Sequence, residues 1–251
     1  MRAGLRAKSE FLLLSLLLGA VVGAIVWLFL FLMNIGLAVF WDVLPAAIGG
    51  RYLPVLVSIV GGLVLGLYER RFGVYPDSLD AAMGEVKRTG GYAYGKGRLL
   101  KGAIGALLPL IFGGSIGPEA GLTGTVAGMC TWVGNHLKGA GRQAREFTTM
   151  GISATLTALF NAPLYGLVAP FESSSGEFEF TKRQKIVSYL LAIIGGMGIM
   201  AVLKSLFGGG MSLPHFETFS IAMGDLVWVV PFAFAGVAMG YLYYGADRLS
   251  R

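Results

Sequence analysis

A long uncharged apolar run near the N-terminus limits what this chain can fold into more than any other feature. The segment Phe11–Phe31 contains no charged residue. A helix of about twenty apolar residues crosses the roughly 30 Å hydrocarbon core of a bilayer at 1.5 Å per residue. Hydrophobic residues make up 55% of the chain and charged residues 14%, against about 25% charged in soluble domains. The sequence therefore predicts an all-α integral membrane protein.

Further apolar segments divide the chain into spanning helices and shorter pieces. Spanning helices are expected at Glu10–Phe40, Leu53–Tyr68, Ile186–Leu203 and 221–246. Three other apolar segments are too short to cross a bilayer comfortably: Leu99–Phe112, Phe147–Leu159 and Leu164–Glu172. Helices that end inside a membrane are tolerated only where their ends are buried in protein or line a cavity. This pattern predicts a channel or transporter with broken and re-entrant helices.

The glycine-rich stretch 113–121 lies between two apolar segments and leads into a predicted helix that continues to Leu137. Pro118 suits the first turn of that helix, where its missing N–H costs nothing. The free N–H groups and the positive end of the helix dipole form an anion site in front of such a helix. The other interpretation is that these glycines only let helices pack closely, as Gly19 and Gly23 are expected to do in the first span.

Charge and composition exclude several classes of function. The net charge of +6 follows from lysines and arginines on the cytoplasmic side of the spans, and no pattern indicates nucleic-acid binding. This bias predicts cytoplasmic termini, in a plasma or inner membrane, but leaves Lys87–Lys101 unassigned. Cys130 has no second cysteine to pair with, and His136 and His215 lie far apart. No metal site, cofactor or enzymatic motif is expected.

Two motifs resemble signatures of one membrane-protein family. The sequence Gly-Ser-Ile-Gly-Pro at 114–118 and the sequence Phe-Asn-Ala-Pro-Leu-Tyr-Gly at 160–166 lie about forty-five residues apart. They resemble the Gly-x-Glu-Gly-Pro and Phe-Asn-Ala-Pro-Leu-x-Gly motifs of the CLC family of chloride channels and proton/chloride exchangers. The resemblance implies a multi-helix inverted-repeat fold that binds chloride or another small anion.

The same resemblance assigns roles to individual residues. It places the anion at the backbone of Gly114, Ser115, Ile116 and Gly117. It makes Pro118, Asn161 and Pro163 the residues that form and support the helix breaks. Asn161 is expected to be a buried amide that holds its break together through hydrogen bonds rather than by touching the ion.

The sequence departs from the family pattern at the positions where protons would be carried. Ile116 stands where the family has its gating glutamate, and Ser173 stands where exchangers have an inner proton glutamate. Glu119 is a possible displaced gate, although a glutamate in the first turn is more commonly a partner of the helix dipole. Glu172 is a possible proton relay or an interfacial charge. We therefore expect passive anion conduction, with a proton-coupled or fluoride exchanger as the alternative.

The chain is long enough for one of the two inverted repeats that the resemblance implies. The expected organisation is a cytoplasmic N-terminus at 1–9, a first repeat at 10–205, a loop at 206–220, a helix like the start of a second repeat at 221–246, and a tail at 247–251. We expect the chain to be the front part of a longer or split protein. Alternatives are pairing with an inverted half, a homodimer, or a non-conducting structural subunit.

Overall fold

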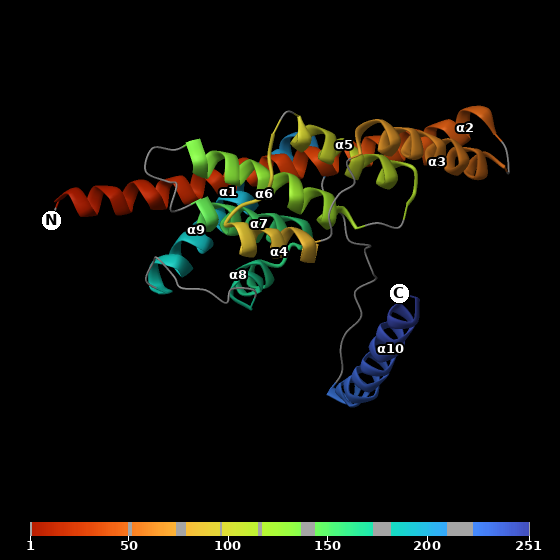
Figure 1. Ribbon diagram of the computed structural model, residues 1–251. Helices are drawn as coiled ribbons and strands as arrows, with labels where there is room; N and C mark the ends of the chain where they lie inside the picture. The colour runs from red at the N-terminus through yellow and green to blue at the C-terminus, as the bar shows by residue number, and fades with distance from the viewer. Residues whose placement is uncertain are drawn as a thin grey trace. The chain divides into compact units, whose positions relative to one another are not determined.

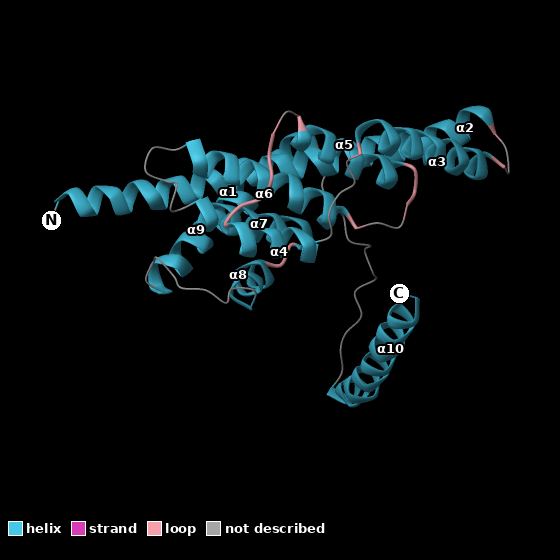
Figure 2. Ribbon diagram, viewed as in Figure 1, coloured by secondary structure: helices cyan, strands magenta, loops and turns pink. Residues whose placement is uncertain are grey.

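The computed structural model describes residues 2–49, 52–73, 79–95, 97–114, 117–136, 144–172, 182–209 and 223–250. These residues form helices and loops and contain no strand, as Figures 1 and 2 show. The chain divides into two compact units, Met1–Ser212 and Leu213–Arg251. Four described helices are long and apolar enough to cross a membrane: Phe11–Ile48, Leu53–Phe72, Arg183–Phe207 and Val229–Ala246. The prediction of an all-α membrane protein is confirmed.

The first unit contains nine α-helices among its described residues. They are α1 (Arg2–Leu37), α2 (Leu44–Ile48), α3 (Leu53–Phe72), α4 (Leu79–Thr89), α5 (Arg98–Ile111), α6 (Pro118–His136), α7 (Ala144–Phe160), α8 (Pro163–Glu172) and α9 (Lys182–Phe207). The second unit contains a 3-10 helix at Met223–Trp228, followed by α10 (Val229–Ser250).

The first helix is longer than the sequence predicted. We expected the first span to end at Phe40. Instead a π-helical stretch, Ala38–Val43, joins α1 directly to α2. The N–H of Leu44 bonds back to the carbonyl of Val39 within this wider turn. The chain thus continues through Pro45 as helix, and Gly49, with a φ of 63°, ends it.

Helices α1 and α9 pack with their backbones in direct contact and run parallel. A Cβ atom on Gly19 would lie 2.6 Å from the Cα of Ala192, and one on Gly23 would lie 2.8 Å from the Cα of Gly196. Small residues four apart on each helix therefore let the two backbones meet. The prediction that Gly19 and Gly23 form a helix contact is confirmed.

Helix α7 lies in the interior and organises its neighbours (Figure 1). Every residue from Gly151 to Leu159 is buried. Polar side chains of α7 can form hydrogen bonds within the helix itself. The Thr155 hydroxyl, for example, donates to the Gly151 carbonyl at 2.8 Å. The Thr148 and Thr131 hydroxyls lie 2.8 Å apart and join α7 to α6. Helix α7 thus forms the centre of the core, and α6 packs against it.

We expect Gly23→Ala to destabilise the protein by about 1–3 kcal/mol, because the added methyl group would overlap the α9 backbone. The matched control is Gly62→Ala, since a Cβ at Gly62 would meet nothing within 4 Å. The measurement is the midpoint of thermal unfolding in detergent. Equal midpoints for the two variants would show that the α1–α9 contact is not as close as described.

Candidate anion-binding site

The first part of the turn after α5, Phe112–Gly114, is held against the helical segment that contains Trp41. Gly113 has a φ of 82°, which favours glycine. The N–H of Gly114 donates to the Pro109 carbonyl at 2.7 Å and closes the end of α5. The indole N–H of Trp41 donates to the Ile111 carbonyl at 3.0 Å. A Cβ on Gly113 would lie 2.6 Å from the Trp41 ring, so the ring presses directly on the turn.

Helix α6 begins at Pro118, directly after this turn, as the proline predicts. Its body lies in the core, because Leu122, Thr123 and Val126 have no exposed surface. Gly117, Pro118 and the Glu119 side chain are only partly buried. The helix therefore presents its N-terminus at the edge of the core. Ser115 and Ile116 lie outside the described residues.

Glu119 folds back over the turn rather than pointing along the helix. A Cβ atom on Gly117 would collide with both carboxylate oxygens of Glu119. The carboxylate thus lies against the Gly117 backbone, at the positive end of the α6 dipole. A negatively charged group of the protein itself occupies part of the space in front of this helix, so an external anion would bind beside it or displace it.

The junction between α7 and α8 turns through a left-handed residue. Asn161 has a φ of 49° and is the non-glycine residue with positive φ in the described part of the chain. The N–H of Ala162 donates to the Thr157 carbonyl at 3.3 Å, and α8 begins at Pro163. The Asn161 side chain is exposed, so the expectation of a buried amide is wrong. Asparagine suits the position because its short side chain tolerates this backbone conformation.

Helix α8 lies very close to α7 at Gly166. A Cβ on Gly166 would collide with the Thr157 hydroxyl, and the Ser153 hydroxyl donates to the Gly166 carbonyl. Thr157 is fully buried, and its hydroxyl has no hydrogen-bond partner among the described residues. Sequence reasoning missed this contact. The available signal was two small polar residues four apart, Ser153 and Thr157, in the buried second half of the helix.

The two motifs lie at the same end of the α6–α7 pair. The helices are antiparallel, because Thr131 near the end of α6 meets Thr148 near the start of α7. The beginning of α6 and the end of α7 are therefore on the same side. Glu172 is the last residue of α8, and its side chain lies outside the described residues.

The interrupted helices and the helix N-terminus at the edge of the core are features typical of ion channels and transporters. Residues 61–248 match the family described as voltage gated chloride channel. The match covers most of the chain, which therefore belongs to the CLC family of chloride channels and transporters. No curated protein matches the sequence.

The left-handed backbone at the α7–α8 junction gives a direct prediction. Asn161→Val should destabilise the protein by about 1–2 kcal/mol, because a β-branched residue is strained at positive φ. Asn161→Gly should be close to neutral, since glycine adopts this conformation without strain. Thermal unfolding of both variants in detergent would test this. If valine is tolerated as well as glycine, the junction does not depend on a left-handed residue.

Proposed function

We propose that the chain forms a passive pathway for chloride or another small anion, with the anion held in front of α6. The observation that carries the proposal is the partly exposed N-terminus of α6, preceded by the glycine turn, on a helix whose body is buried. The N–H groups around Ser115, Ile116 and Gly117 would bind the dehydrated ion, aided by the helix dipole. Such binding is weak enough for the ion to leave as well as enter.

The proposed pathway is passive because the side chains at the two proton-carrying positions of the family cannot be protonated. Isoleucine at 116 and serine at 173 carry no titratable group in the physiological range. Glu119 is the one acidic residue in the stretch 113–121. The position of its carboxylate over Gly117 is consistent with an interaction with the helix dipole. In this mechanism Glu119 stabilises the helix start and does not carry protons through the protein.

A second candidate makes Glu119 a displaced gate in a proton-coupled or fluoride exchanger. The position of its carboxylate favours this candidate, because the group lies at the mouth of the helix where an anion would bind. Protonation would neutralise the carboxylate and release it from the dipole. Glu172 would then be the second carboxylate on the proton path.

Anion efflux from liposomes distinguishes the candidates. We expect chloride efflux from liposomes containing the purified protein, without proton movement reported by an enclosed pH-sensitive dye. We expect the Glu119→Gln variant to behave like the natural protein, with chloride efflux and no proton movement. Proton movement in the natural protein that disappears in Glu119→Gln would establish the exchanger instead. A complete lack of efflux would support a non-conducting half or structural subunit.

Gly117→Leu should abolish most of the chloride efflux, because a side chain there would collide with Glu119 and fill the space in front of the helix. Gly62→Leu is the matched control, since Gly62 is exposed and a Cβ there meets nothing within 4 Å. Both variants should be assayed at equal protein content per liposome. Unchanged efflux in Gly117→Leu would move the site elsewhere.

Orientation and assembly are part of the same proposal. The N-terminal ends of α1, α7 and α9 lie together: the Phe11 and Phe147 ring centroids are 5.4 Å apart, and Glu146 pairs with Lys185 at 3.4 Å. The N-terminal ends of these three helices thus form a single basic region. This supports a cytoplasmic N-terminus in a plasma or inner membrane. A homodimer or pairing with an inverted half would supply the second helix end of the anion site.

A further inference from the structure

The end of α3 and the beginning of α5 are joined in a way that the sequence did not predict. The Tyr68 hydroxyl donates to the Lys101 carbonyl at 2.7 Å. Further along, a Cβ on Gly61 would lie 2.6 Å from the Cβ of Phe112. The two helices are therefore antiparallel, and the last turn of α3 lies beside the first turn of α5. This contact places Lys101, whose side of the membrane the sequence left open, on the same side as Arg71.

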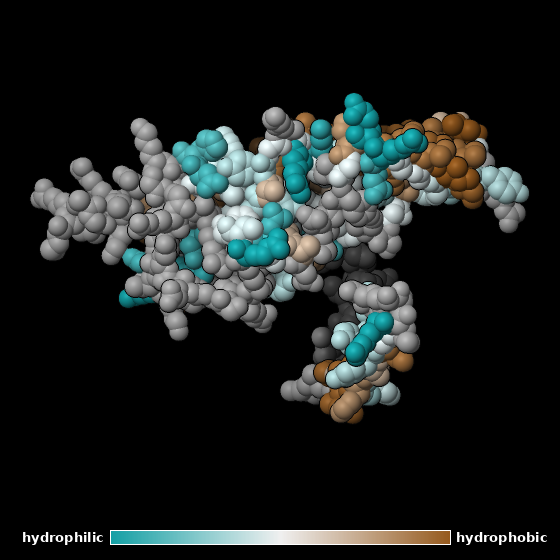
Figure 3. Space-filling model, in the orientation of Figure 1, coloured by the Kyte–Doolittle hydropathy of each residue, from teal (hydrophilic) through white to brown (hydrophobic). Residues whose placement is uncertain are grey.

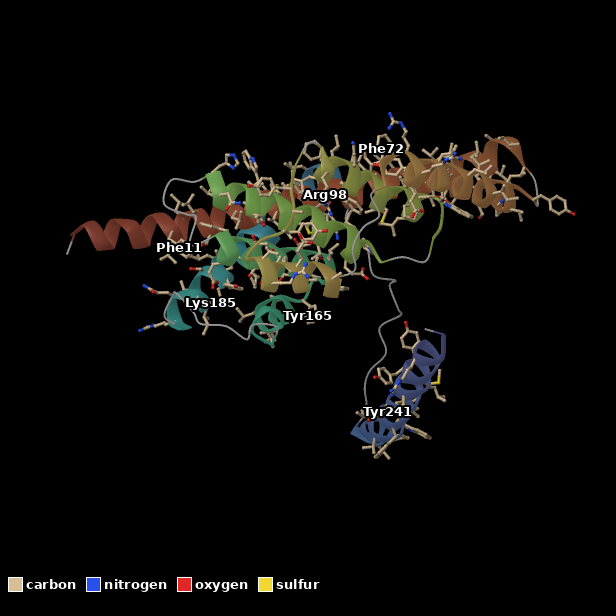
Figure 4. The ribbon with its side chains drawn as sticks, in the orientation of Figure 1. Phe11, Phe72, Arg98, Tyr165, Lys185 and Tyr241 are labelled. Carbon is tan, nitrogen blue, oxygen red and sulfur yellow. The ribbon has the colours of Figure 1, made fainter. Side chains whose placement is uncertain are left out.

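Two cations lie over one aromatic ring at this junction. The Lys101 Nζ atom lies 5.0 Å from the Phe72 ring centroid, and the Arg71 Cζ atom lies 5.6 Å from it. Arg98 is exposed in the first turn of α5, three residues before Lys101; Figure 4 labels both Arg98 and Phe72. Arg70 precedes Arg71 in the last turn of α3. The last turn of α3 and the first turn of α5 thus carry four cations, two of which lie over the Phe72 ring.

These cations have no acidic partner in the described part of the chain. The ion pair that the described residues form joins Lys185 to Glu146, in the first turns of α9 and α7. Glu69 is the acidic residue nearest in sequence, and it forms no ion pair with them. The ring of Phe72 can orient the cations but cannot neutralise them. Among the described residues, the junction thus has four cations and one carboxylate, that of Glu69, which leaves an excess of positive charge.

An exposed apolar surface leads directly to this charge. Helix α3 exposes apolar side chains along its length, and Leu63 and Leu67 are 64% and 65% exposed. On α5, Leu100 and Ile104 are also exposed, one residue before and three residues after Lys101. Figure 3 shows hydrophilic residues where α3 and α5 adjoin, next to the hydrophobic surface of α3. A ligand that fits needs an anionic head and long apolar chains.

We propose that the α3–α5 junction binds an anionic glycerophospholipid. Its phosphate would bind Arg71, Arg98 and Lys101, and its acyl chains would lie along the exposed apolar side of α3. A guanidinium binds phosphate through two parallel hydrogen bonds, and an ammonium adds a point charge. Tyr68 and Phe72 lie at the end of the candidate span Leu53–Phe72, and aromatic side chains are common at the ends of membrane spans. A zwitterionic lipid would not compensate the charge.

The test compares phosphatidylglycerol with phosphatidylcholine on the full chain, purified in detergent and stripped of lipid. Native mass spectrometry measures the affinity for each lipid. Arg71→Gln with Lys101→Gln should weaken phosphatidylglycerol binding by about fivefold for each cation removed, hence about 25-fold for the pair, and should not change phosphatidylcholine binding. The charge-preserving pair Arg71→Lys with Lys101→Arg should keep the preference for phosphatidylglycerol.

The matched control removes two exposed cations of α9, Arg183→Gln with Lys204→Gln. An equal loss in this control would mean that net charge alone attracts the lipid, and would overturn the site. Displacement of phosphatidylglycerol by millimolar inorganic phosphate would show a free-anion site instead of a lipid site. Should the variants fail to fold, a photoactivatable phosphatidylglycerol on the natural protein must crosslink to α3 and α5. Crosslinks confined to other helices would contradict the proposal.

Discussion

The rest of the structure depends on the backbone contact between α1 and α9. Two helices in lipid gain little from the hydrophobic effect, because acyl chains are as apolar as leucine, so close packing of small residues must hold them together. Gly19 and Gly23 meet Ala192 and Gly196 for this reason. The Cβ of Ala154 on α7 lies 3.7 Å from where a Cβ on Gly196 would be. Helix α7 thus packs against the α1–α9 pair, and α6 and α8 in turn pack against α7.

The sequence predicted the features that depend on composition and spacing. The helical class, the spans and the contact at Gly19 and Gly23 follow from apolar length and from small residues four apart. It failed where conformation depends on a local choice. The π-helical stretch before Pro45 is one alternative to a break at that proline, and apolarity does not decide between them. Asn161 has a left-handed backbone and an exposed side chain, whereas the sequence suggested a buried amide.

The candidate site shows the same division. Pro118 and the glycines before it indicate a helix start, and α6 begins there. The position of the Glu119 carboxylate over Gly117 depends on a side-chain rotamer, which spacing cannot give. The contact of Thr157 with Gly166 depends on the angle at which α8 returns across α7. Ser115 and Ile116 lie outside the described residues, so their part in the site stays a prediction.

Glu119 would be a weak competitor for an anion in front of α6. A carboxylate in the first turn of a helix contributes about 0.3–1 kcal/mol, which corresponds to a factor of about two to five in an equilibrium. An incoming anion can therefore displace Glu119 at a small cost in affinity. When no anion is bound, the Glu119 carboxylate would compensate the positive end of the α6 dipole. When an anion arrives, the weakly held carboxylate would move aside. This account requires no proton transfer.

The location of the bound ion is the central claim, and bromide tests it most directly. Bromide replaces chloride and scatters anomalously, so crystals grown in bromide reveal its position in an anomalous difference map. The account predicts a peak in front of α6, beside the backbone of Gly117, with the Glu119 side chain moved away. Bromide peaks that lie only elsewhere in the membrane-spanning part, with the α6 N-terminus empty, would contradict it.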